Sequence, residues 1–110
     1  MPLSRRARIE VYLVVDNSAG HKLLLDAIER EFIGTFGGCT VIRGAKGLYL
    51  SETGSIDEDD INVIYADTPF EIDADFEGLS TYTDSLKATL LEATSEESIL
   101  IVIHEIFHSV

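Results

Sequence analysis

The sequence predicts an α+β fold, a βαββαβ plait in which two helices cover one face of an antiparallel sheet. Three observations predict it: apolar residues alternate with period two in several segments, they recur every three or four residues in two others, and these segments follow one another in βαββαβ order. This order is that of the ferredoxin-like fold. The 110 residues, 45% hydrophobic and 25% charged, suit one globular domain. We expect this domain over residues 8–110, after a flexible basic arm over residues 1–7.

The first strand and helix are predicted by the spacing of apolar residues, which changes from every second residue to every third or fourth. In residues 8–15, Ile9 and Val11 share one face with other apolar residues, and Glu10 and Tyr12 lie on the other. Apolar side chains at helical spacing then run from residue 24 to residue 36, after capping side chains at 16–18 and before two glycines. We therefore expect a strand followed by a helix of about four turns.

The middle of the chain predicts a hairpin. Residues 39–51 are β-like but contain Gly44 and Gly47, which predict a bend or bulge. Residues 52–59 are polar and predict a turn, and residues 60–66 are again β-like. The two β-like segments should pair with each other.

A second helix and a last strand complete the pattern. Apolar residues recur at helical spacing from Phe76 to about Thr94. Residues 98–107 contain the run Ile-Leu-Ile-Val-Ile, which is too short for a membrane helix and rich in β-branched residues. We expect this run to form a strand at an edge of the sheet.

Two patterns resemble metal sites, and we expect no metal at either. His104 to His108 reads H-E-x-x-H, but the run continues a strand, where residues four apart lie roughly 13 Å apart, too far to share one ion. Acidic residues in 73–84 follow the spacing of a calcium-binding EF-hand loop, with departures at its fifth, eighth and twelfth positions. Calcium binding by the acidic residues 57–60 or 73–84 is the alternative that the sequence does not decide. No cofactor is expected.

The chain lacks the glycine-rich phosphate loops and nucleophile elbow of familiar enzymes. The candidates for a site are therefore polar residues that a plait could bring together. Three lie on the sheet face opposite the helices and are catalytic candidates, with His104 as acid or base: Tyr12, Asp16 and His104. Three others are candidates for ligand binding: His21, Arg43 and Tyr49.

Net charge and cysteine content indicate which partners are excluded and in which compartment the protein lies. Eight basic and 20 acidic residues give a net charge of −12, which repels nucleic acid and anionic membranes. The single cysteine, Cys39, cannot form an internal disulfide, which agrees with a reducing compartment. We expect a cytoplasmic protein with no nucleic-acid or membrane partner.

The sheet face away from the helices is predicted to mediate self-association. Monomers rarely expose a contiguous apolar patch, and this face is expected to carry one. Its predicted members are Val14, Ile64, Ala66, Leu100, Val102 and Ile106. We expect a homodimer or higher oligomer.

Four stretches resemble a family of small uncharacterised proteins found in cyanobacteria. They are residues 36–40, 47–51 and 61–70 and the final strand. The resemblance implies one cytoplasmic domain and supplies no established activity, cofactor or catalytic residue. Two classes of function remain. The first is a non-catalytic oligomeric module that binds a protein partner or a small ligand. The alternative is a small enzyme acting through His104, Tyr12 and Asp16.

Overall fold

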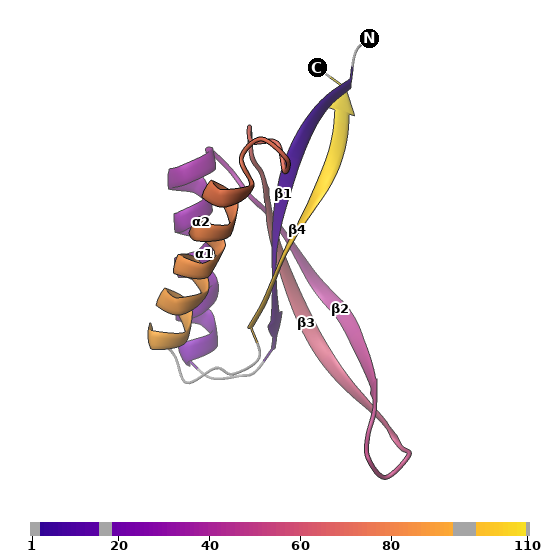
Figure 1. The fold of residues 1–110 in the computed structure, drawn as a ribbon. Coiled ribbons are helices and arrows are strands. Elements are labelled where there is room, and N and C mark those ends of the chain that lie inside the picture. Colours follow the sequence, from indigo (N-terminus) through magenta and orange to yellow (C-terminus); the bar gives the residue numbers. More distant parts are fainter. Residues whose placement is uncertain (1–2, 16–18, 94–98, 110) are drawn as a thin grey trace.

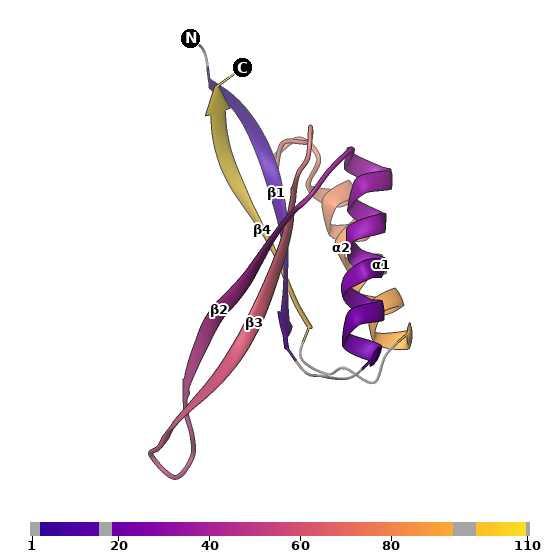
Figure 2. The ribbon, with the colours of Figure 1, turned by 180° about the vertical axis from the view of Figure 1, so that it is seen from behind.

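The computed structural model describes residues 3–15, 19–93 and 99–109. Its elements are β1 (Leu3–Val14), α1 (Ala19–Phe36), β2 (Thr40–Leu50), β3 (Ile56–Asp67), α2 (Phe76–Ala93) and β4 (Ile99–Ser109). The strands form one antiparallel sheet in the order β2-β3-β1-β4, so β4 lies at an edge as predicted. Both helices lie on the same side of this sheet (Figures 1 and 2). The predicted ferredoxin-like plait is confirmed.

The core lies between the two helices and the sheet. Ile9 and Val11 of β1 are fully buried, and Phe32 of α1 is buried with them. Because side chains alternate along a strand, the residues between these positions point to the opposite face of the sheet. Neither of the two described helices lies over that face (Figure 2). We call it the open face.

Two residues expected on the open face lie in the core instead. Ile64 and Ala66 are 0% and 1% exposed, and they pair in register with Val11 and Ile9, which face the helices. The prediction was wrong because β3 has apolar residues on both faces. Hydrophobicity alone therefore does not show whether its odd-numbered or its even-numbered residues face the helices. Ile61 of β3 pairs with Val14 and lies on the open face.

The chain enters β1 earlier than predicted. Leu3 to Ala7 were assigned to a flexible arm, but they pair in register with Glu105 to Ser109 of β4. Ala7 is fully buried, and its carbonyl accepts hydrogen bonds from the Thr68 amide and hydroxyl, both 2.9 Å long. Arg5 lies over the Phe107 ring, with its guanidinium carbon 5.7 Å from the ring centroid. The arginines of this segment suggested a flexible arm because their partners lie in β4, at the other end of the sequence.

The β2–β3 hairpin is longer than predicted and projects beyond the helices (Figure 1). A break in register between Ile42 and Ala45 confirms the predicted bend, and Gly44 there has a φ of 80°, which favours glycine. The acidic residues 57–59, which were expected in a turn, lie in β3. Lys46 of β2 forms ion pairs with Asp60 and with Glu58, the latter at 3.3 Å. The capping residues predicted at 16–18 lie outside the described residues.

Deleting residues 1–6 should destabilise the protein. The deletion removes four register pairs with β4, those of Leu3 to Arg6. At about 0.2–1 kcal/mol for each pair, the free energy of unfolding should fall by about 1–4 kcal/mol. Thermal unfolding followed by circular dichroism should show a melting temperature lower by at least about 4 °C. The exposed Leu3→Ser change serves as a control and should have little effect. An unchanged melting temperature after the deletion would instead support a flexible arm.

Candidate functional site

A group of hydrogen-bonded polar side chains lies on the open face, centred on Glu10 of β1. The Tyr12 hydroxyl donates to one carboxylate oxygen of Glu10, with an O–O distance of 2.5 Å. His104 Nε2 lies 2.8 Å from the other oxygen. Glu10 and Tyr12 share a face because they are two residues apart on one strand, and His104 reaches Glu10 from the neighbouring strand β4. We call these three side chains the Glu10 cluster.

The electrostatics of the cluster favour an ionised Glu10. Burial opposes ionisation, since its side chain is only 15% exposed, but hydrogen bonds from Tyr12 and His104 outweigh burial and hold the pKa of Glu10 below its ordinary value. The same hydrogen bond to Glu10, together with burial, raises the pKa of Tyr12. An ionised Glu10 can only accept hydrogen bonds, so His104 Nε2 is the donor. In the neutral imidazole this leaves Nδ1 without a proton.

An ion pair lies beside the Glu10 cluster on the same face. Arg8 donates through Nε and Nη2 to the two carboxylate oxygens of Asp67, at 2.6 and 3.1 Å. Its guanidinium carbon lies 4.0 Å from the centroid of the Tyr65 ring. The hydrogen bond to Asp67, partly opposed by burial, raises the pKa of Arg8. A bidentate and stacked arginine has a fixed orientation, so this pair is a rigid part of the surface.

The structure brings together two of the three catalytic candidates. Tyr12 and His104 meet through Glu10, whereas Asp16 lies outside the described residues. Sequence reasoning placed Glu10 on the correct face without assigning it a role. The alternation in β1 contained this signal, because positions 8, 10 and 12 share one face. The contact with His104 links residues 94 positions apart and has no local signal.

The ligand-binding candidates are spread over the molecule. His21 is buried on the helix side of the sheet, where its Nε2 lies 3.2 Å from Asn62 Nδ2. Arg43 is exposed at the bulge in β2. Tyr49 lies near the end of β2 and lines a hollow of about 420 Å³ on the open face together with Tyr12. Among the predicted ligand-binding residues, therefore, Tyr49 shares the face of the Glu10 cluster.

The patterns that resemble metal sites adopt other structures. His104 and His108 lie on strand β4, as predicted, and His108 Nδ1 lies 3.0 Å from the carbonyl oxygen of Ser109. The acidic run 73–84 enters helix α2 at Phe76. Within residues 3–15, 19–93 and 99–109, no three His, Cys, Asp or Glu side chains are grouped so that they could hold a metal ion. Nor does the described part of the chain contain a helix long and apolar enough to cross a membrane.

Comparison with known proteins identifies the fold. No protein-family model matches the chain, and no curated protein matches it. The solved structure of CutA1 from Oryza sativa is 18% identical with a TM-score of 0.56, over 91% of this chain and 80% of that chain. A phage SAM lyase in complex with S-methyl-5'-thioadenosine is 16% identical with a TM-score of 0.56, over 96% and 88%.

A third solved structure, CPII from Thiomonas intermedia K12 bound to ADP, AMP and acetate, is 19% identical. Its TM-score is 0.50, over 99% of this chain and 93% of that chain. At such identities the likeness shows the fold alone. The chain is a small α/β protein with the ferredoxin-like fold that these structures share. Its resemblance to the cyanobacterial family stays a prediction.

Glu10→Gln tests the Glu10 cluster through its pH dependence. A lowered pKa means that the carboxylate stabilises the fold above its ordinary pKa of 4.5, and that this contribution is lost as the pH falls through the lower pKa of the folded state. The variant should therefore lose about 1–3 kcal/mol at pH 7 and much less at pH 3. Urea unfolding at both pH values measures the difference.

Glu52, an exposed residue in the turn between β2 and β3, provides the control. Glu52→Gln should leave the free energy of unfolding at pH 7 unchanged within about 0.5 kcal/mol. An equal loss for Glu10→Gln at pH 7 and pH 3 would show that the ionised form of Glu10 is not the stabilising one.

Proposed function

We propose that this protein is a non-catalytic, homo-oligomeric α/β module whose copies associate through the open face and bind a protein partner or small ligand there. The observation that carries the proposal is the apolar surface around the Glu10 cluster. Leu100, Val102 and Ile106 of β4 pair in register with Tyr12, Glu10 and Arg6 and so lie on the open face. Leu100 is 55% exposed in the single chain. Contiguous apolar surface of this kind marks interaction sites.

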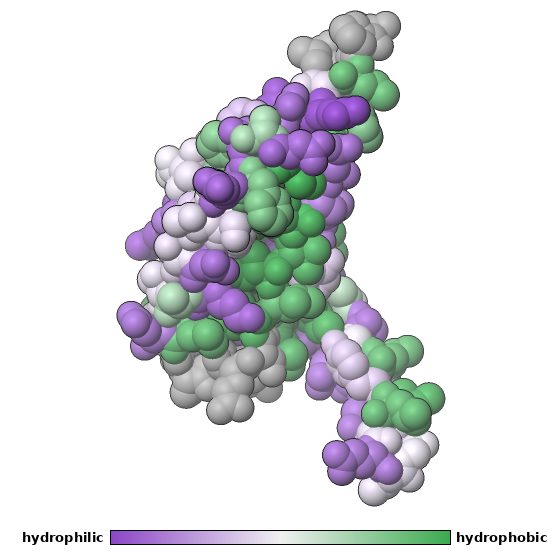
Figure 3. Space-filling view, in the orientation of Figure 1, coloured by the Kyte–Doolittle hydropathy of each residue, from purple (hydrophilic) through white to green (hydrophobic). Residues whose placement is uncertain are grey.

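A second exposed apolar surface lies at the end of the β2–β3 hairpin, on the other face of the sheet from the Glu10 cluster. Leu48, Leu50 and Ile56 are all largely exposed near its end. Figure 3 shows apolar residues on this projecting arm, at a distance from the helices. An isolated two-stranded hairpin is only marginally stable in water. We expect the arm to pack against a second copy, where these side chains would leave water.

The energetics favour association. Burying about 400 Å² of apolar area on each partner gives a gross gain of about 20 kcal/mol at roughly 25 cal/mol per Å², against an association cost of about 4–15 kcal/mol. The net charge of −12 opposes association, but salt at about 0.15 M screens it beyond about 8 Å. The edge strand β4 adds a further reason, because residues 99–103 carry none of the charges or prolines that prevent edge pairing.

The polar groups of the open face suit an interface. The Arg8–Asp67 ion pair and the hydrogen bonds from Tyr12 and His104 to Glu10 are all made within one chain, so that burial would leave none of these polar groups without a partner. Fixed charges in an apolar surface also restrict how a second copy can dock, because a wrong orientation would bury a charge against an apolar group. We infer that these pairs set the orientation of the assembly.

A small enzyme that uses His104 as acid or base is the second candidate. It is favoured by the hydrogen bond to Glu10, which orients the imidazole as acid–base chemistry requires. Against it, the hollow beside Tyr12 is not lined by His104 or Glu10, and the Tyr12 hydroxyl already donates to Glu10. This arrangement supports the binding module. A cytoplasmic location without nucleic-acid or membrane partners belongs to the same proposal and rests on the acidic charge.

Val102→Glu tests the proposed interface. The change places a carboxylate at the position paired with Glu10, where an apolar contact would otherwise be buried. In sedimentation velocity at micromolar concentration, the wild-type protein should sediment at a multiple of 12.1 kDa and the variant at 12.1 kDa. Leu23→Glu is the matched control, since Leu23 is 68% exposed on α1, and this variant should sediment as the wild type does.

Circular dichroism establishes that each variant is folded, and Leu100→Lys replaces Val102→Glu if that variant is not. A wild-type protein that sediments at 12.1 kDa would contradict the proposal. So would folded open-face variants that keep the wild-type mass.

A further inference from the structure

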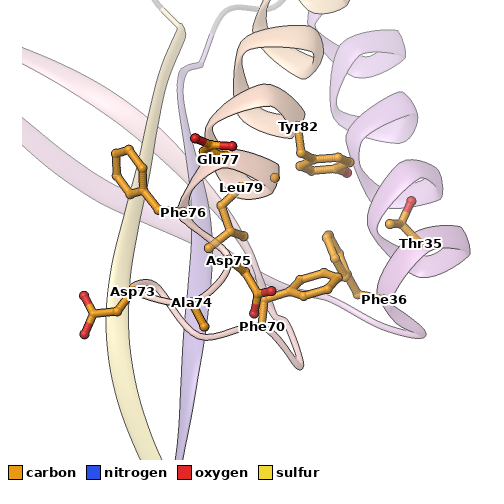
Figure 4. Close-up of a pocket in the computed structure, with 11 residues that line it drawn as sticks. Thr35, Phe36, Phe70, Asp73, Ala74, Asp75, Phe76, Glu77, Leu79 and Tyr82 are labelled. Atoms are coloured by element: carbon orange, nitrogen blue, oxygen red, sulfur yellow. The ribbon is translucent and has the colours of Figure 1, made fainter.

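A cavity of about 780 Å³ lies on the helix side of the sheet, away from the open face (Figure 4). It is formed where the end of α1 meets the loop before α2 and the first turns of α2. Four of the nine Phe and Tyr residues of the chain line it, and none of the described residues that line it is basic. The aromatic members are Phe36, Phe70, Phe76 and Tyr82. The cavity is thus unusually rich in aromatic rings.

Three of the rings gather on one side of the loop. Figure 4 shows Phe36, Phe70 and Tyr82 on the side of the loop that faces α1, whereas Phe76 extends away on the other side. The Phe36 and Tyr82 rings meet edge-on, with centroids 5.5 Å apart and planes at 74°. Phe70 remains 41% exposed although it is large and apolar. The described residues therefore leave part of the surface of these aromatic rings exposed.

The Tyr82 ring stays uncharged over the physiological pH range. Its hydroxyl donates to Glu31 Oε1 at 3.0 Å. Burial, and next the hydrogen bond to Glu31, raise the pKa of Tyr82 to about 12. Tyr82 therefore contributes a neutral ring to the cavity, with the Glu31 carboxylate hydrogen-bonded to its hydroxyl.

Among the described residues that line the cavity, the charged groups are all carboxylates. They belong to Asp73, Asp75 and Glu77. Asp75 is half-buried, and one of its oxygens accepts a hydrogen bond from the Glu71 amide at 2.9 Å, which fixes the side chain. In Figure 4 the Asp75 side chain lies on the same side of the loop as Phe36 and Phe70, whereas Asp73 points away. Negative charge and aromatic surface thus occur together on that side.

We propose that this cavity binds an organic cation, namely an alkylated ammonium group on a small molecule. The faces of aromatic rings attract cations through their quadrupole, and carboxylates at the rim add Coulomb attraction. A bare metal ion would need several oxygen ligands in place of rings. An anion would be repelled by the Asp75 carboxylate, which lies beside the rings (Figure 4). The site lies on the other side of the sheet from the proposed interface, and its test does not depend on the oligomeric state.

Choline and its neutral analogue 3,3-dimethylbutan-1-ol test the proposal, because the two have similar shapes and differ in charge. Isothermal titration calorimetry on the full chain should show choline binding at least about tenfold more tightly than the alcohol. Equal affinities would overturn the proposal. So would equal or tighter binding of the anion 3,3-dimethylbutanoate, since that result would assign the site to anions or to apolar groups.

Variants with matched controls locate the binding. Phe70→Leu keeps an apolar side chain but removes the ring, and Asp75→Asn keeps the hydrogen-bond acceptor but removes the charge. Each should weaken choline binding by about three- to tenfold. Phe107→Leu on β4 and Asp84→Asn on α2 change the same residue types outside the cavity and should leave the affinity unchanged.

Nuclear magnetic resonance of the wild-type protein keeps the test independent of how the variants fold. Choline should shift the amide signal of Gly78 and the methyl signals of Leu79, both of which line the cavity. Shifts confined to residues of the open face, or cavity variants that are folded and bind choline with wild-type affinity, would overturn the proposal.

Discussion

A sheet that is covered on one face only is the constraint on which the other features of this protein depend. Alternation along β1 sends Ile9 and Val11 into the core and Glu10 and Tyr12 to the open face. The polar groups on that face satisfy one another, as in the pairs of Glu10 with Tyr12 and with His104. The apolar groups beside them can leave water only by contact with another molecule. The proposed self-association rests on this imbalance.

The two sides of the sheet carry different chemistry. The open face combines apolar side chains with the Arg8–Asp67 ion pair and the hydrogen-bonded Glu10 cluster, an arrangement that suits contact with another protein surface. The cavity at the ends of the helices combines aromatic rings with Asp75 and lies among side chains of one chain, which suits a small ligand. A protein of this size can therefore use one side of its sheet for assembly and keep the other for binding.

The order of helices and strands could be predicted from the sequence because each element carries its own periodicity. The start of β1 could not, since the pairing of Leu3 to Ala7 with β4 joins the two ends of the chain. The sequence also did not show which residues of β3 face the helices, because Ile61 and Ile64 are both apolar although they lie on opposite faces. The Glu10–His104 contact and the cavity around Phe36, Phe70 and Tyr82 depend on the packing of distant segments, for which sequence spacing gives no signal.

The accessibility of Leu100 to solvent tests most directly whether the open face is covered in solution. Leu100 and Leu23 are 55% and 68% exposed in the single chain, on β4 and α1 respectively. A soluble paramagnetic agent broadens the methyl signals of leucines that it can reach. If copies associate through the open face, the agent should broaden the Leu23 methyl signals strongly and leave those of Leu100 sharp. Equal broadening of both would show that the open face is in water and would contradict the account.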